Sequence, residues 1–406
     1  MKQDSHVKFT HLFQIPWAEL EARRGRVIER LKREELDCMV FFSPSSVFYL
    51  TGWEFFVTER PTALVLWWDG AAEMLVPRLE LEHVQSVAQG LSGVECYKDY
   101  PDLRHPMHYL ADMLTRRGRI RIGSDSPGSP AFQGYQGPSI PELLPDYDFV
   151  LLPKMIEEMR KIKSPFEISM IKESARWGNL AMALLQEYTR PGERELDVVN
   201  RACHEATQAM LRTLGADFIP GGVFWVGAHG NYRGQIGVDS ALPHALIKNV
   251  KFKEGDVVNG SGTTYPILGY ISEMERTMFV GEPSAEQRKY FNLACELQDY
   301  AFHCVRAGRT CGDVDRDVRG FYKEHGIADY WMHHTGHALG MDRHEPPFLD
   351  IAEETVIQPG MVFSIEPGIY IPGFGGFRHS DTIHVTQTGI ELLTYYPREL
   401  ERLICG

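Results

Sequence analysis

The tract Gly269–Thr277 reads Gly-Tyr-Ile-Ser-Glu-Met-Glu-Arg-Thr, and three shorter motifs follow it toward the C-terminus. They are Gly336–Gly340 (Gly-His-Ala-Leu-Gly), Glu366–Gly368 (Glu-Pro-Gly), and Arg378 placed shortly before Asp381. Carboxylate and imidazole side chains at such positions are the ligand types of hydrolytic metal centres. Such side chains therefore recur in short motifs along the C-terminal half of the chain.

These motifs resemble those of the prolidase, methionine aminopeptidase and creatinase superfamily, whose shared architecture is the pita-bread fold. In the peptidases of that superfamily, two Asp, one His and two Glu hold two divalent metal ions. Counting along the motifs, the five positions in this chain are Gly262, Glu273, His337, Glu366 and Ser380.

The five positions supply too few anionic oxygens for two adjacent divalent ions. Gly262 has no side chain, and Ser380 offers a neutral hydroxyl in place of a bridging carboxylate. Two neighbouring cations need several carboxylates to offset their repulsion. We therefore expect no metal and no cofactor; the alternative is one weakly held ion on Glu273, His337 and Glu366.

Without metals, the chain most resembles the creatinase and ectoine hydrolase branch, in which the tract also ends in Glu-Arg-Thr. The histidine twelve residues before Asp256 is His244, and the resemblance gives it the role of catalytic acid and base. Imidazole suits proton transfer near neutral pH. Glu275 and Glu366 are expected to hold a substrate cation, as paired carboxylates bind a guanidinium or amidinium; the alternative for Glu275 is an ion pair with Arg276.

Four further residues are expected to bind substrate. The resemblance places His337 and His344 beside the substrate or the attacking water, and Glu273 beside a histidine that it orients. In the N-terminal part, Arg60 resembles an arginine that reaches the neighbouring subunit and binds substrate carboxylate, although a surface arginine is an equal alternative. This expectation implies a homodimer. The sequence leaves open whether His333 or His334 faces the site.

The composition of the chain limits the kinds of partner that it is expected to bind. The 406 residues include 55 acidic and 42 basic side chains, a formal charge of −13, which argues against nucleic acid or an anionic membrane as partner. A small zwitterionic substrate fits better. Because Met1–His6 leads into no apolar run, we expect no secretory signal and a cytoplasmic protein. The seven scattered cysteines lack metal-site or disulfide spacing.

The expected fold class is α/β (α+β), with two domains covering 1–158 and 159–406. An amphipathic helix at 17–36 precedes an apolar strand at 37–42, and apolar strands at 63–68 and 72–76 flank the turn Asp69-Gly70. Ser164 with Glu167, three residues apart, predicts a capping box that opens the second domain.

The second domain contains two similar helical pairs. The turns Arg190-Pro191-Gly192 and Arg306-Ala307-Gly308 each separate two helices, and strands are expected at 362–365 and 383–386. The repetition hints at an internal duplication with pseudo-twofold symmetry, as in a pita-bread domain.

Three functions remain open. The leading interpretation is a metal-independent hydrolase of a non-peptide C–N bond in a small amidine or guanidino acid, with His244 moving the proton. The alternative is a metal-dependent Xaa-Pro dipeptidase or aminopeptidase. A third is a binding protein without activity, which the many titratable groups at site positions disfavour.

Overall fold

The computed structural model describes residues 14–98, 104–129, 137–215, 218, 227–265 and 267–406. The segment Met1–His6, used above to exclude a secretory signal, and Pro266 of the creatinase-like tract lie outside the described residues. The chain divides into two compact units, Met1–Met159 and Arg160–Gly406.

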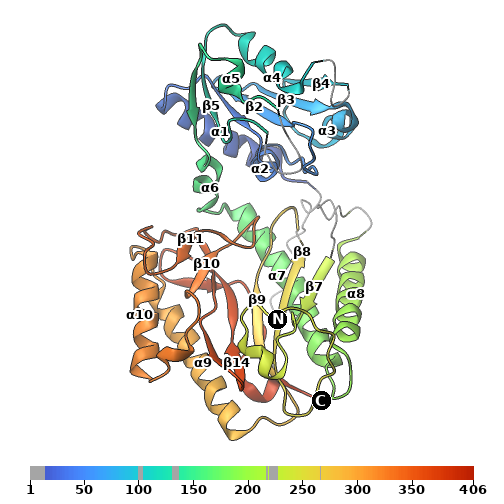
Figure 1. Ribbon diagram of the computed structural model, residues 1–406, viewed down its shortest axis with the longest axis vertical. Coiled ribbons are helices and arrows are strands. Elements are labelled where there is room, and N and C mark those ends of the chain that lie inside the picture. Colours follow the sequence, from blue (N-terminus) through green and yellow to red (C-terminus); the bar gives the residue numbers. More distant parts are fainter. Residues whose placement is uncertain (1–13, 99–103, 130–136, 216–217, 219–226, 266) are drawn as a thin grey trace, which may run out of the picture. The chain divides into compact units, whose positions relative to one another are not determined.

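The first unit is an α/β domain built on one sheet of six strands in the order β4-β3-β2-β1-β5-β6 (Figure 1). Its strands are β1 Cys38–Phe41, β2 Ala63–Trp67, β3 Ala72–Pro77, β4 Gly93–Tyr97, β5 Arg121–Ser124 and β6 Asp148–Leu151. Its helices are α1 Trp17–Arg33, α2 Pro44–Thr51, α3 Leu81–Val87, α4 Pro106–Thr115 and α5 Ile140–Leu143, and α6 Met155–Arg160 leads out of it.

The expected hairpin of this unit is confirmed. Strands β2 and β3 pair antiparallel around the turn, and Gly70 takes the left-handed conformation (φ 94°) that favours glycine. Every residue of β1 and β2 is buried, which agrees with their continuous apolar sequence.

The second unit carries a larger sheet in the order β11-β10-β12-β15-β9-β8-β7, with β16 and β17 attached to it and a separate β13-β14 hairpin. Its strands are β7 Gly227–Asn231, β8 Val257–Tyr265, β9 Met274–Val280, β10 Gly336–Ala338, β11 Glu345–Leu349, β12 Val362–Ile365, β13 Gly368–Ile371, β14 Gly375–Arg378, β15 Ser380–Val385, β16 Ile390–Leu392 and β17 Ile404–Cys405. Its helices are α7 Pro165–Tyr188, α8 Glu195–Leu214, α9 Ala285–Cys304 and α10 Cys311–Glu324.

Two helix pairs support the two halves of this sheet. Helices α7 and α8 pack against β7 and β8, while α9 contacts β12 and the β13-β14 hairpin and α10 contacts β11 (Figure 1). This arrangement agrees with the two helical pairs expected from the sequence. The strands that bear the site motifs are thereby fixed from one side by helices.

Local capping signals place two of these helices. Ser164 accepts a hydrogen bond from the Glu167 amide (3.2 Å), and the Glu167 carboxylate accepts one from the Ser164 amide (2.8 Å). Ser284 and Gln287 form the equivalent box at the start of α9. The capping box predicted at Ser164 is confirmed, because it needs only residues three positions apart.

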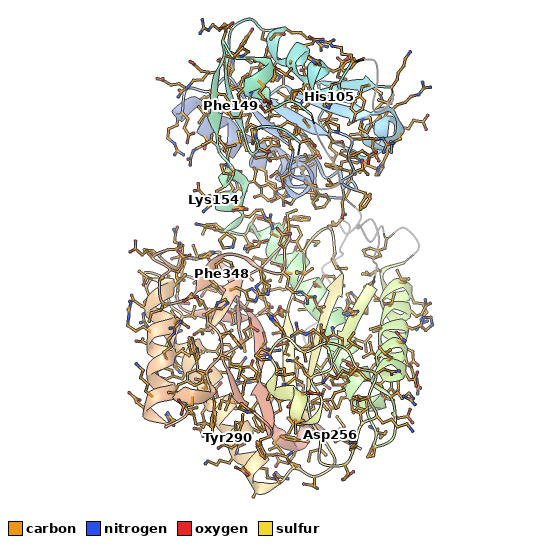
Figure 2. The ribbon with its side chains drawn as sticks, in the orientation of Figure 1. His105, Phe149, Lys154, Asp256, Tyr290 and Phe348 are labelled. Carbon is orange, nitrogen blue, oxygen red and sulfur yellow. The ribbon has the colours of Figure 1, made fainter. Side chains whose placement is uncertain are left out.

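The core of the second unit includes an aromatic cluster under the β13-β14 hairpin. Tyr290 of α9, labelled in Figure 2, has its ring centroid 6.0 Å from that of Phe374 and 5.8 Å from that of Phe377. All seven cysteines are free, as their spacing predicted. None of the helices formed by the described residues has the length and apolar character needed to cross a bilayer.

Candidate active site

A cavity of about 390 Å³ opens where β8, β9 and β12 meet the loops that follow β10 and precede β8. Its lining residues are Arg233, Pro243, His244, Ser261, Glu273, Glu275, Met332, His333, His334, Arg343, His344, Glu366 and Arg378. The size suits a small ligand, and convergent charged groups in such a cavity mark a candidate active site.

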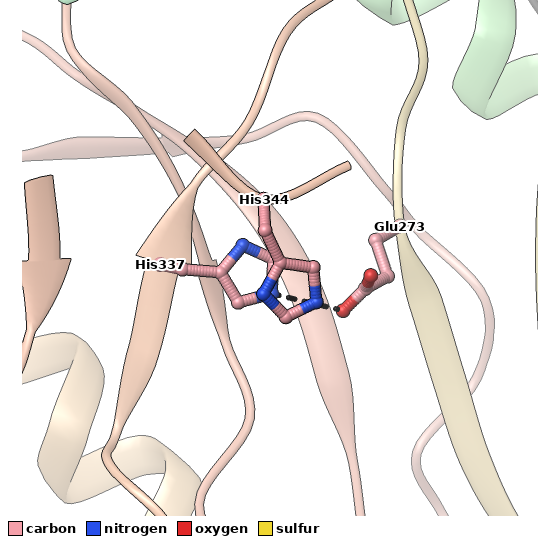
Figure 3. A group of neighbouring side chains, drawn as sticks. All are labelled: Glu273, His337 and His344. Carbon is pink, nitrogen blue, oxygen red and sulfur yellow. Dashed lines mark ion pairs between the residues drawn. The ribbon is translucent and has the colours of Figure 1, made fainter. Parts of the chain in front are cut away.

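Three side chains from separate segments converge at this cavity (Figure 3). Glu273 lies just before β9, His337 lies in β10, and His344 lies in the loop after β10, with the two imidazole rings stacked at a centroid distance of 3.8 Å. His337 Nε2 lies 3.8 Å from Glu273 Oε1 and 3.1 Å from Glu366 Oε1. The sequence prediction that Glu273 accompanies a histidine agrees with this contact.

The charges of this group depend on one another. Burial, followed by repulsion from Glu366, raises the pKa of Glu273 to about 7. Burial alone would lower the pKa of His337, but contact with Glu366 and Glu273 raises it to about 9. Burial opposes ionisation of Glu366, yet the hydrogen bond from His337 keeps its pKa below the ordinary value. His337 Nε2 thus lies between two buried carboxyl groups, and a metal ion bound there would take the place of a proton on that nitrogen.

Two arginines neutralise the carboxylate of Glu275. Arg378 contacts Glu275 Oε2 through Nε, and Arg233 lies 3.3 Å from Glu275 Oε1. The alternative partner, Arg276, instead pairs with buried Asp381 at 2.8 Å. Because two cations already face it, Glu275 has little charge left for a cationic substrate.

A two-ion centre does not fit these residues. The cavity face of β8 carries the hydroxyl of Ser261, whereas a Cβ added at Gly262 would lie 2.4 Å from the backbone oxygen of Gly178 on α7. Neighbouring residues of a strand point to opposite faces, so position 262 faces the helix and not the cavity. Ser380 is buried, and its hydroxyl donates to Glu273 at 3.4 Å. Neither position supplies the missing carboxylates.

A single divalent ion does fit. Glu273, His337 and His344 each offer one ligand atom, and these atoms lie within 4.8 Å of one another. Three protein ligands of the types Glu and His are typical of catalytic zinc sites, in which a fourth position stays open. This set differs from the single-ion alternative of the sequence analysis by having His344 in place of Glu366.

The structure brings most of the predicted site residues together. His244, exposed in the loop before β8, lines the cavity with Glu273, Glu275, Glu366 and His344, and their individual roles stay predictions. His337 lies directly behind this lining, in contact with Glu366.

The remaining histidines and Arg60 have distinct surroundings. Both His333 and His334 line the cavity. His333 Nε2 lies 2.7 Å from the Tyr370 hydroxyl, and the ring centroid of His334 lies 5.8 Å from that of Phe348. Arg60 belongs to the other unit, where it pairs with Glu59 at 2.6 Å. Its expected place in a partner's site stays a prediction.

Sequence reasoning assigned no role to three cavity arginines: Arg233, Arg343 and Arg378. Arg378 was named only as part of the motif that precedes Asp381. Arg343 directly precedes His344, and a basic residue beside a predicted site residue was the available signal. Arg233 had no such signal, because its loop carries no motif.

Two family descriptions match the chain. "Metallopeptidase family M24" matches residues 169–387, and "Creatinase/Prolidase N-terminal domain" matches residues 23–162. The chain therefore belongs to metallopeptidase family M24, in the form that carries a creatinase/prolidase N-terminal domain. The expected fold, a creatinase-type N-terminal α/β domain followed by a pita-bread catalytic domain, is confirmed.

Individual relatives point to peptidases. A solved Xaa-Pro dipeptidase from Bacillus anthracis is 26% identical, covers 94% of this chain and 99% of its own, and superposes with a TM-score of 0.76. A prolidase from Pyrococcus horikoshii is 26% identical, with coverage of 93% and 99% and a TM-score of 0.74. An uncharacterized peptidase of Bacillus subtilis is 28% identical over 90% of this chain and 95% of its own.

These matches correct the leading functional prediction. A metal-independent hydrolase of a non-peptide C–N bond, of creatinase or ectoine hydrolase type, is wrong, and so is placement of the chain in that metal-free branch. The peptidase alternative is the better supported. The prediction failed because the missing carboxylates at 262 and 380 bear on how many ions bind, and they do not identify the bond that is cleaved.

Proposed function

We propose that this protein is a peptidase that hydrolyses the bond preceding proline in short peptides, as an Xaa-Pro dipeptidase does. The observation that supports this most strongly is the similarity to the solved Xaa-Pro dipeptidase, which extends over both units at 26% identity. Membership of metallopeptidase family M24 supports the same class of reaction, the hydrolysis of a peptide bond. The cavity of about 390 Å³ is of a size that admits a small ligand.

Glu273, His337 and His344 would hold a single divalent ion. Such an ion, when bound, polarises a carbonyl oxygen and makes water a better nucleophile. His337 Nδ1 lies 3.0 Å from the Ala338 carbonyl, which orients the ring so that Nε2, the atom 3.1 Å from Glu366, is the one that would hold the ion. The ion pairs that Arg378 and Arg233 form with Glu275 hold the cavity wall rigid.

The proton is transferred by His244 in this proposal. In hydrolysis, the water oxygen joins the carbonyl carbon, the C–N bond to proline breaks, and the proline nitrogen gains a proton. His244 has no hydrogen-bonding partner in the described part of the chain and lies at the cavity. Its imidazole is therefore free to take a proton from water and return it to the leaving nitrogen.

A homodimer with Arg60 supplied by the partner is a further part of this proposal, and it rests on the sequence resemblance. It is not needed for the chemistry assigned to the cavity.

The test is proline release from alanyl-proline by purified protein supplied with Mn²⁺, Co²⁺ or Zn²⁺, with alanyl-leucine as the comparison. His244→Ala is expected to lower turnover by about 100-fold, the usual contribution of one acid–base group. His303→Ala is the matched control, because His303 is exposed on α9, away from the cavity lining, and its Nδ1 lies 2.7 Å from the Asp299 carbonyl. Unchanged turnover in His244→Ala would remove that residue from the mechanism.

A further inference from the structure

Among the described residues, one arginine of the cavity forms no ion pair with a carboxylate. Of its three arginines, Arg378 and Arg233 both contact Glu275. The two remaining cavity carboxylates, Glu273 and Glu366, face His337 instead.

The third arginine is Arg343. It lines the same cavity and is half-buried, and over the residues that the structure covers it has neither an ion pair nor a hydrogen bond from its side chain. A guanidinium is costly to hold partly out of water without a partner, so such a group is suited to an anionic ligand.

The loop that presents Arg343 is held by a buried ionic network. The carboxylate of Glu345, which is 5% exposed, accepts hydrogen bonds from the backbone amides of Met341 (2.8 Å) and Asp342 (3.0 Å). Lys163 lies 3.3 Å from the same carboxylate, and Arg160 also pairs with it. The backbone on both sides of Arg343 is thus fixed before any ligand arrives, which reduces the entropy lost on binding.

We infer that Arg343 binds the C-terminal carboxylate of the substrate, so that the substrates are dipeptides with a free carboxyl end. The planar fork of arginine donates two parallel hydrogen bonds to a carboxylate, which gives orientation as well as affinity. His344 follows Arg343 directly and is one of the three convergent residues of the site, so a peptide anchored at Arg343 has its scissile bond near them. The inference rests on the proposed function.

The experiment compares alanyl-proline with its C-terminal amide, which lacks the charge. Binding is measured by calorimetry on chelator-treated protein, and turnover is measured on ion-supplied protein. The wild type is expected to bind the free acid about 10- to 100-fold more tightly than the amide, the range for a hydrogen bond between charged groups. In Arg343→Met the ratio of the two affinities should fall to about 1, while the affinity for the amide stays the same as in the wild type.

Two further variants make the result specific. Arg343→Lys keeps the charge without the fork and should keep only part of the preference. Arg316→Met is the matched control, since it removes an exposed arginine of α10 that pairs with Asp313 outside the cavity lining, and it should retain the preference for the free acid. A preference that survives in Arg343→Met, or that disappears in Arg316→Met, would overturn the inference. Hydrolysis of neither compound by the wild type would instead overturn the proposed function, while the calorimetric preference still reports on Arg343.

Discussion

His337 Nε2 lies 3.1 Å from Glu366 Oε1, and both side chains are almost fully buried. This contact joins β10 to the end of β12 and fixes the imidazole between two carboxylates, Glu366 and Glu273. The proposed single-ion site depends on this arrangement. His337 Nδ1 lies 3.0 Å from the Ala338 carbonyl, so the ring keeps Nε2 toward the two carboxylates, where it can serve as the ligand atom.

Removing the charge of Glu366 is expected to impair catalysis without unfolding the protein. Glu366→Gln keeps the shape of the side chain but weakens its hold on His337, and we expect kcat/KM for alanyl-proline to fall by about 100-fold or more. Steady-state kinetics, with circular dichroism as a check of folding, would measure this. Activity within a few-fold of the wild type would show that the contact is not needed.

Because α7 and β8 approach each other closely, replacing Gly262 by a larger residue should destabilise the protein. The added Cβ would lie 2.4 Å from the Gly178 backbone oxygen, so Gly262→Ala should lower the free energy of unfolding by about 1–3 kcal/mol. Gly320→Ala on α10 is the control, because nothing lies within 4 Å of its Cβ, and it should stabilise by up to about 1 kcal/mol. Urea denaturation would compare them; equal effects would contradict the packing described here.

The buried ion pair between Arg276 and Asp381 should be essential for stability. Their side chains are 1% and 3% exposed at a distance of 2.8 Å. Asp381→Asn leaves a buried guanidinium without its counter-charge and should cost about 3–5 kcal/mol. Glu401→Gln, which breaks an exposed pair with Arg288, should cost less than about 1 kcal/mol. Similar losses for both variants would refute the distinction.

Because His379 is buried, we expect the free energy of unfolding to depend on pH. Burial, followed by the charges of Arg276 and Arg398, keeps its pKa well below the model-compound value of 6.5, and neither ring nitrogen has a hydrogen-bond partner among the described residues. The unfolded chain therefore binds a proton near pH 6.5 that the folded chain does not, so stability falls as the pH drops through that value.

Replacement of this histidine should remove that contribution. Between pH 6.5 and pH 5.5 the wild type should lose about 1 kcal/mol more than His379→Phe. Denaturant titrations of both proteins at the two pH values would measure the difference. An equal loss in the two proteins would mean that His379 accepts a proton in the folded state.

The sequence predicted the fold well because its signals are local. The capping boxes at Ser164 and Ser284 and the turn at Gly70 each depend on a few adjacent residues. The gathering of His244, Glu273, Glu366 and His344 in one cavity also agrees with motif spacing.

The features of the site that could not be predicted from the sequence depend on contacts between distant segments. That Glu275 pairs with Arg378, 103 positions away by residue number, and not with adjacent Arg276, follows from the β9 and β14 geometry. Counting along the motif placed Gly262 at a ligand position, but the pleat of β8 turns that position toward α7. Which side of a strand faces the cavity is a tertiary property.

The most direct test of the account is proline release from alanyl-proline by chelator-treated protein to which one equivalent of Mn²⁺, Co²⁺ or Zn²⁺ per chain is added back. We predict that release is restored by the first equivalent and stays absent in His337→Ala, which lacks a central ligand. Failure of all three ions to give any proline release, or equal release by the wild type and His337→Ala, would contradict the assignment of peptide hydrolysis to this cavity.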